Sequence, residues 1–247
     1  MTRLITIIIS IVFTLISCSK DDHNPSTYTD TPVLPGMPQV NSDTTIAPRS
    51  FLALGDSYTI GQSVSALDRF PVQTVRDLNV RGIKFEAPEI IAQTGWTTGN
   101  LLNALAFSPP GKPKYDIVTL LIGVNNQYQH RTQQEYAEQF LTLLNLAMTY
   151  AGNDRKRVIV LSIPDYSVTP FASGSDKELI AKEIDSFNVI NKRISTQMVV
   201  NYLDITGFSR LAANNPALIA TDGLHPSGLE YKVWVEGLVP IIKEAVK

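Results

Sequence analysis

Three residues of this chain have the types and the spacing that nucleophilic catalysis needs. Ser57 ends the turn sequence Gly55-Asp56-Ser57, directly after a short apolar run. His225 follows Asp222 by three residues, so the carboxylate can accept from one ring nitrogen while the other faces a serine. A serine hydroxyl is a weak nucleophile unless such a base takes its proton. We therefore expect acyl transfer through Ser57, with His225 as base and Asp222 as its orienting carboxylate.

The choice of base rests on the few histidines of the chain. There are three, and His23 lies in a polar stretch that reads as solvated, so His130 and His225 remain. Only His225 has a carboxylate at the right spacing. Asp56, beside the serine, is expected to bond backbone groups of its own turn rather than orient the base.

Acyl transfer also needs hydrogen-bond donors for the developing oxyanion. Gly95, in the stretch 93–98, can present its N–H because it has no side chain to block close approach. In the stretch 122–126, Asn125 and Asn126 each offer an amide donor. Each of these residues could equally be an ordinary turn or loop residue. The residue types alone do not show which of the two asparagines would be the donor.

Taken together, and in this order, the four stretches resemble those of the SGNH hydrolases, also called the GDSL family. The resemblance runs from about Arg49 to the C-terminus. It implies a serine esterase with no cofactor and no metal, and an oxyanion hole made by the Ser57 N–H, Gly95 and Asn125, since Gly-x-Asn is the family spacing. One departure is Tyr58, where the family's name-giving motif has leucine.

Three further side chains follow these stretches and are candidates for substrate binding. They are Trp96, Tyr128 and His130. Aromatic rings at the rim of a site can stack on sugar, whereas most aromatic side chains serve the core. Both interpretations remain open.

The elements that must position these residues alternate between strand and helix. This alternation predicts an α/β fold with three α/β/α layers, a flavodoxin-like parallel sheet with helices on both faces. Ligands of such sheets bind at the carboxyl ends of the strands, where the first three stretches fall. The run 116–122 is the most apolar, which predicts a central strand. The expected strands are 51–54, 89–92, 116–122, 158–162 and 202–205, and the expected helices 72–78, 99–107, 132–150, 176–199 and 227 onward, with a kink near Pro240.

Composition limits the range of functions. The 247 residues are 44% hydrophobic and 18% charged, which suits one globular domain with a real core. The net charge of −2 gives no basic footprint for nucleic acid. The single cysteine, Cys18, excludes an internal disulfide and a cysteine cluster for zinc.

The N-terminus is typical of an exported lipoprotein. Residues 1–17 read as a signal peptide, and Leu15-Ile16-Ser17-Cys18 looks like a bacterial lipobox, in which the cysteine is acylated. Residues 18–48 then form the lipidated cysteine and a flexible polar tether, and 49–247 the hydrolase domain. We expect anchoring to the cell envelope, at the outer membrane or cell surface. The alternative is an uncleaved anchor with an incidental cysteine.

The leading functional hypothesis is an exported esterase that acts on short acyl, chiefly acetyl, esters of carbohydrate. A second is a lysophospholipase or thioesterase, because the family includes both. A third is a catalytically silent binding module on the same fold. The presence of all the expected active residues argues against the third. The oligomeric state and the periplasmic or surface orientation stay open.

Overall fold

A computed structural model describes residues 47–247. The predicted signal peptide and Cys18 lie outside the described residues, as does the predicted tether up to residue 46. Residues 47–247 belong to one unit.

Five parallel strands form the centre of this unit, in the order β2-β1-β3-β4-β5. This is the flavodoxin-like α/β fold that the sequence predicts. Strand β3 is central, and every residue of β1 and β3 is buried, which explains why their sequences lack polar alternation. The strands are β1 (Phe51–Gly55), β2 (Glu89–Ala92), β3 (Ile117–Leu121), β4 (Val158–Leu161) and β5 (Asn201–Leu203).

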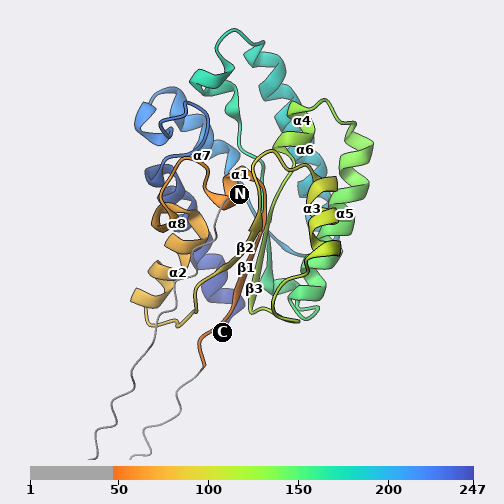
Figure 1. The fold of residues 1–247 in the computed structure, drawn as a ribbon, viewed down its shortest axis with the longest axis vertical. Helices are drawn as coiled ribbons and strands as arrows, with labels where there is room; N and C mark the ends of the chain where they lie inside the picture. The colour runs from red at the N-terminus through yellow and green to blue at the C-terminus, as the bar shows by residue number, and fades with distance from the viewer. Residues whose placement is uncertain (1–46) are drawn as a thin grey trace, which may run out of the picture. The chain divides into compact units, whose positions relative to one another are not determined.

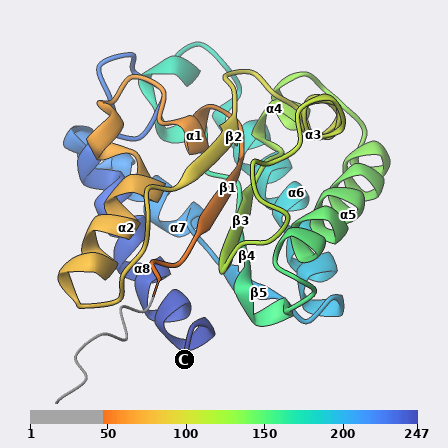
Figure 2. The same cartoon turned by 60° about the horizontal axis from the view of Figure 1, so that its bottom comes forward.

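Helices cover the sheet in two layers (Figures 1 and 2). On one face α2 (Phe70–Val80) packs against α8 (Gly228–Ala245). On the other face α5 (Gln133–Tyr150) packs against both α3 (Thr98–Phe107) and α6 (Lys177–Gln197). None of these described helices is long and apolar enough to cross a bilayer.

Side-chain caps start the long helices where the sequence predicts them. Thr132 caps α5 by accepting from the Glu135 N–H, and Ser227 caps α8 by accepting from the Glu230 N–H. Helix α8 continues past Pro240 as one helix to Ala245.

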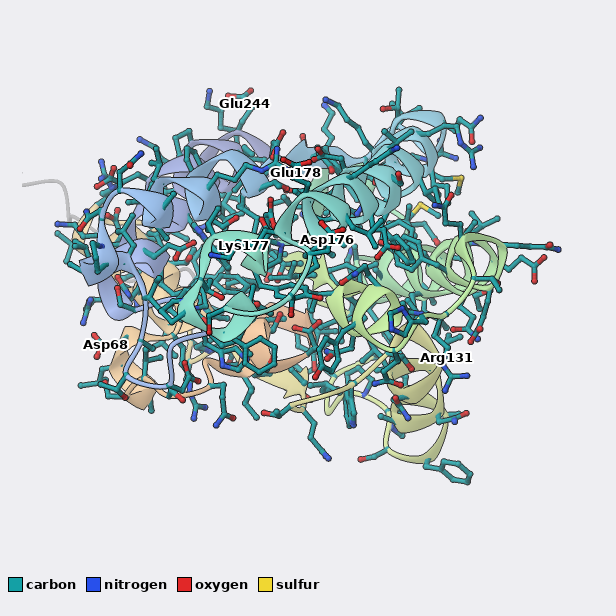
Figure 3. All side chains as sticks on the ribbon, turned by 90° about the horizontal axis from the view of Figure 1, so that it is seen from above. Asp68, Arg131, Asp176, Lys177, Glu178 and Glu244 are labelled. Atoms are coloured by element: carbon teal, nitrogen blue, oxygen red, sulfur yellow. The ribbon has the colours of Figure 1, made fainter. Side chains whose placement is uncertain are left out.

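Three helices of only four or five residues were not expected from the sequence. They are α1 (Ser57–Ile60), α4 (Val124–Tyr128) and α7 (Thr206–Arg210). Helix α1 follows β1 after one residue, Asp56, and α4 follows β3 across a two-residue turn. Both therefore lie at the carboxyl ends of central strands, the end that Figure 3 views from above. The loop that leads to Asp176, at the start of α6, crosses the middle of that view.

Glu230, on α8, gives the fold a dependence on pH. Its side chain is buried, and burial raises the pKa of this carboxyl to about 7, although Trp234 Nε1–H donates to it at 3.2 Å. Between about pH 4.5 and 7 the native state holds a proton that the unfolded chain has released, so this group lowers the free energy of unfolding as pH rises through that window.

We expect Glu230→Gln to be more stable than the wild type at pH 8, by about 1–3 kcal/mol, because glutamine keeps the acceptor for Trp234 without a buried charge. Urea unfolding of both proteins at pH 5 and pH 8 tests this. The variant's advantage should grow between the two values, and an advantage independent of pH would contradict the assignment.

Candidate active site

Ser57 is the first residue of α1, and the turn before it holds it in place. Asp56 caps this helix, accepting from the Tyr58 N–H at 3.0 Å, as its expected local role requires. A side chain on Gly55 would place its Cβ 2.1 Å from Thr59 Oγ1, so only glycine fits there. The Ser57 side chain is 3% exposed, so its hydroxyl does not lie on the outer surface of the turn. It lies at a cavity wall instead.

Asp222 and His225 form the pair that their spacing predicts. Asp222 Oδ2 lies 2.6 Å from His225 Nδ1, and the imidazole is 6% exposed. The Tyr58 ring packs against the imidazole with a centroid separation of 5.1 Å. His225 also lines the cavity of Ser57, without a direct hydrogen bond to its Oγ within residues 47–247. Such contacts are often long before substrate binds.

The Asp222 carboxylate accepts four hydrogen bonds. Oδ1 accepts from the Leu224 and His225 N–H groups, each at 3.0 Å, and Oδ2 accepts from Ser63 Oγ and His225 Nδ1. Partial burial opposes its ionisation, but these bonds, led by those from Ser63 and the His225 ring, hold its pKa well below the usual range. Asp222 is therefore a charged acceptor behind the imidazole.

Asp56, by contrast, sits in an environment that disfavours charge. Burial raises its pKa to about 7, against the hydrogen bond from the Tyr58 N–H. Its Oδ2 has no hydrogen-bond partner among residues 47–247. Asp56 contacts neither His225 nor Asp222 through a hydrogen bond in that range, so it does not compete with Asp222 for the base.

Gly95 reaches the same cavity from the loop after β2, and Asn125 reaches it from α4, after β3. Gly95 has φ +82°, and a Cβ there would meet nothing within 4 Å. The left-handed backbone favours glycine at this position, and the close approach of an oxyanion to its N–H stays a prediction. The Asn125 amide donates one hydrogen to the Trp96 carbonyl at 3.0 Å, which leaves the second amide hydrogen for a ligand.

The structure separates Asn125 from its neighbour Asn126. Asn126 is fully buried, and both ends of its side-chain amide form hydrogen bonds with Thr98. Its Oδ1 accepts from the Thr98 N–H at 2.9 Å, and its Nδ2 donates to Thr98 Oγ1 at 2.7 Å. Asn126 thus ties α4 to the start of α3, and Asn125 is the asparagine that lines the cavity.

The cavity has a volume of about 110 Å³ and two kinds of wall. Ser57, His225, Gly95 and Asn125 supply polar groups. The apolar lining includes Tyr166, Phe171 and Leu224, which were not expected from the sequence. Tyr166 and Phe171 lie in a segment with no periodic pattern or motif, and Leu224 is an unspecified position of the Asp-x-x-His loop. The full lining is Ser57, Tyr58, Thr94, Gly95, Val124, Asn125, Tyr128, Tyr166, Phe171, Leu224 and His225.

Of the three candidate substrate-binding side chains, only Tyr128 lies on this cavity. It is 52% exposed and packs with Tyr166 and Phe171. Trp96 is half-buried, because its ring packs against the core, and it meets the site only through its backbone carbonyl. His130 is exposed, with φ +54°, and lies outside the cavity lining. The expectation for Trp96 and His130 is corrected accordingly.

Asn125→Ala tests the oxyanion donor. We expect turnover to fall by about a hundredfold or more with little change in the Michaelis constant, because the predicted role of the amide is to donate to charge that develops only in the transition state. Steady-state kinetics on a soluble ester measure both. A change confined to the Michaelis constant would make Asn125 an ordinary substrate contact.

Within residues 47–247 no group of three or more His, Cys, Asp and Glu side chains is arranged to hold a metal ion. The residues that line the cavity include a serine hydroxyl, an imidazole and a side-chain amide, beside backbone N–H groups. These are the parts of serine acyl transfer.

Comparison with known proteins agrees with this geometry. The profile of the GDSL-like lipase/acylhydrolase family matches residues 53–233. No curated protein matches the chain. Solved structures with a similar fold include the acetylxylan esterase Axe2 from Geobacillus stearothermophilus, with 19% identity, a TM-score of 0.60, and coverage of 81% of this chain and 96% of that one.

Two other solved structures share the fold. The lipase/acylhydrolase from Enterococcus faecalis has 20% identity and a TM-score of 0.59, with coverage of 81% of this chain and 97% of that one. TesA has 16% identity and a TM-score of 0.60, with coverage of 80% and 99%. The family profile includes all four stretches around the cavity, from the serine turn to the Asp-x-x-His loop. The chain therefore belongs to the GDSL-like lipase/acylhydrolase family and is an ester-hydrolysing enzyme.

Proposed function

We propose that this enzyme removes short acyl groups, chiefly acetyl, from carbohydrate esters, and that it does so outside the cytoplasm on a lipid anchor. The observation that carries the substrate proposal is the size of the cavity beside Ser57, about 110 Å³. Pockets for drug-sized ligands measure about 300–1,000 Å³, and a dry cavity of about 150 Å³ holds one benzene. The space thus suits a short acyl group.

The proposed reaction has two acyl transfers. Ser57 Oγ attacks the ester carbonyl carbon while its proton passes to His225 Nε2, and the oxyanion accepts from the Ser57 and Gly95 N–H groups and the Asn125 amide. The C–O bond to the alcohol then breaks, and His225 returns the proton to the leaving oxygen. Water attacks the acyl-enzyme in the same way, gives its proton to His225 and releases the acid, and Ser57 regains its proton.

Two features support a carbohydrate as the alcohol part. Tyr128 and Phe171 are 52% and 45% exposed and line the cavity, so they offer flat amphipathic surface where the alcohol would lie. The similar structure Axe2 is an acetylxylan esterase. These rings take the place of Trp96, which does not reach the cavity.

The second candidate is hydrolysis of lipid acyl esters or thioesters. The observation in its favour is the apolar part of the cavity, where Val124, Tyr166 and Leu224 lie beside the aromatic rings. A long acyl chain could leave the cavity and lie over Phe171. The two candidates differ in how the rate depends on acyl length.

A substrate series decides between them. The purified enzyme is assayed on acetyl, butyryl, octanoyl and palmitoyl esters of one alcohol, beside an acetylated oligosaccharide and a lysophospholipid. We expect kcat/KM to be highest for acetyl and for the oligosaccharide. A tenfold preference for long chains or the lysophospholipid, which is about 1.4 kcal/mol in transition-state binding, would reject the carbohydrate proposal.

Matched phenylalanine variants test the aromatic rim. Phe171→Ala should raise KM for the acetylated oligosaccharide several-fold more than for a small acetyl ester, because only the former reaches the ring. Phe107→Ala is the control, since Phe107 is 89% exposed and lies outside the cavity lining. Equal effects of both variants would remove Phe171 from the sugar site.

The proposed anchor rests on Leu15-Ile16-Ser17-Cys18, a short apolar run before it, and the absence of any other cysteine in the chain. Cys18→Ala should prevent attachment of a labelled fatty acid and leave the precursor unprocessed. Label retained in the variant would contradict the lipobox proposal, without bearing on the esterase.

A further inference from the structure

Ser63 contacts the carboxylate behind the candidate base from a distant part of the chain. It lies in the loop after α1, and its Oγ donates to Asp222 Oδ2 at 2.6 Å, across 159 positions of sequence. The same oxygen accepts from His225 Nδ1 at 2.6 Å. Ser63 is thus one hydrogen bond further from the reacting atoms than Asp222.

This contact completes the acceptor set of Asp222. A carboxylate offers about four lone-pair sites, and here each oxygen accepts two hydrogen bonds. Three of the four donors come from the Asp222–His225 loop itself, two backbone N–H groups and the imidazole. Ser63 supplies the only one of the four that the loop cannot provide. With it in place, Oδ2 is held in the direction of the ring.

The loop around Ser63 has an unusual backbone conformation and is tied to a neighbouring loop. Ser63 has φ +65°, a left-handed conformation that side-chain-bearing residues adopt at a cost. The preceding Gln62 accepts from Thr94 Oγ1 at 2.7 Å, which joins the loop to the stretch that carries Gly95. The loop therefore links three of the four stretches around the cavity.

We infer that Ser63 is a positioning residue for the catalytic base, a fourth member of the chain Ser57–His225–Asp222. This rests on the proposed function of those three residues. The Ser63 hydroxyl holds Asp222 Oδ2 in place against His225 Nδ1, so the imidazole keeps one orientation through the reaction. It also donates to a lone pair of Oδ2 that would otherwise be open to water, and this hydrogen bond keeps the carboxylate ionised.

Other ionisable groups lie near Asp222 and His225, and their effect on the pH profile must be distinguished from that of Ser63. Asp56 and Tyr58 approach from the turn after β1, Glu230 and Tyr231 from α8, and Tyr166 from the loop after β4. None of these accepts a hydrogen bond from Ser63 within residues 47–247. Substitution of Ser63 leaves them in place, so a changed pH profile is assigned to the lost donor.

Two variants of Ser63 separate its hydroxyl from its backbone. Ser63→Ala and Ser63→Gly both lose the donor, but glycine accepts φ +65° without strain. Ser65→Ala is the matched control, because Ser65 Oγ donates to a different carboxylate, Asp68 Oδ2, at 2.7 Å in the same loop. The readouts are the pH profile of kcat/KM on an acetyl ester and the proton resonance of His225 Nδ1.

We expect both Ser63 variants to lose about fivefold in kcat with KM nearly unchanged, the loss for one hydrogen bond to a charged group that water partly replaces. The acid limb should move to higher pH and the Nδ1 proton downfield, because a carboxylate with one donor fewer pulls harder on the imidazole proton. Ser65→Ala should match the wild type.

If both Ser63 variants left the acid limb of the pH profile and the His225 Nδ1 proton resonance unchanged, the inference would be overturned. A defect in Ser63→Ala that Ser63→Gly lacks would also overturn it, since that would trace to loop backbone. If the wild type hydrolyses no ester, the proposed function fails, and the Nδ1 resonance, which needs no turnover, still decides the role of Ser63.

Discussion

We expect Ser57→Ala to abolish ester hydrolysis, with kcat lowered by about 10⁴-fold or more, and to leave the fold intact. The alanine variant has no oxygen that can form the acyl-enzyme, and only binding and oxyanion donors remain. The lost hydroxyl makes no hydrogen bond to another described residue, and the Ser57 site opens on a cavity, so the free energy of unfolding should change by less than about 1 kcal/mol.

The measurement pairs kinetics with covalent labelling. An organophosphonate with a good leaving group should add its phosphonyl group to the wild type at Ser57, seen as a mass shift of that peptide, and should leave Ser57→Ala unmodified. Circular dichroism and urea unfolding confirm that the variant is folded. A folded Ser57→Ala protein with full activity would contradict the acyl-enzyme mechanism.

His225→Ala should remove activity to a similar extent, about 10⁴-fold or more in kcat, because no other described histidine reaches the cavity to take the serine proton. In the wild type, activity should fall on acidification as the imidazole becomes protonated and loses its lone pair. The residual activity of His225→Ala should lack this acid limb.

The other histidine among the described residues provides the control. His130 lies outside the cavity lining and has φ +54°, so His130→Asn is the suitable substitution, since asparagine tolerates that backbone. His130→Asn should keep both the rate and the acid limb. If His130→Asn were inactive and His225→Ala active, the base would have to be reassigned.

The paired residues of the site were predictable where their partners are close in sequence. Asp222 and His225 are three residues apart, and their Nδ1–Oδ2 contact forms within one short loop. Likewise Ser57 comes two residues after the end of β1, and a glycine turn after a buried strand puts a side chain at the carboxyl edge of a parallel sheet. Local geometry and strand order are enough in both cases.

The long elements were predictable for a related reason. Strand β3 is buried on both faces, so its sequence is apolar at every position but Thr119, and α5 carries its own capping residue, Thr132. The short helices α1 and α4 were missed. Four or five residues show no helical period, and such helices are held by their surroundings rather than by propensity.

Features that join distant segments of the chain could not be predicted from the sequence and were decided by the tertiary structure. Asn125 and Asn126 differ only because Thr98, on another element, consumes the amide of Asn126. Trp96 turns to the core while Phe171, in a loop without a motif, reaches the cavity.

Ser63 shows the same limit most clearly, because its partner Asp222 lies 159 positions away. The sequence by itself determined the family, the sheet and the residue types of the reaction, since these depend on local pattern and order along the chain. The folded structure alone decided which side chains share the cavity, because that depends on how loops from different strands pack together.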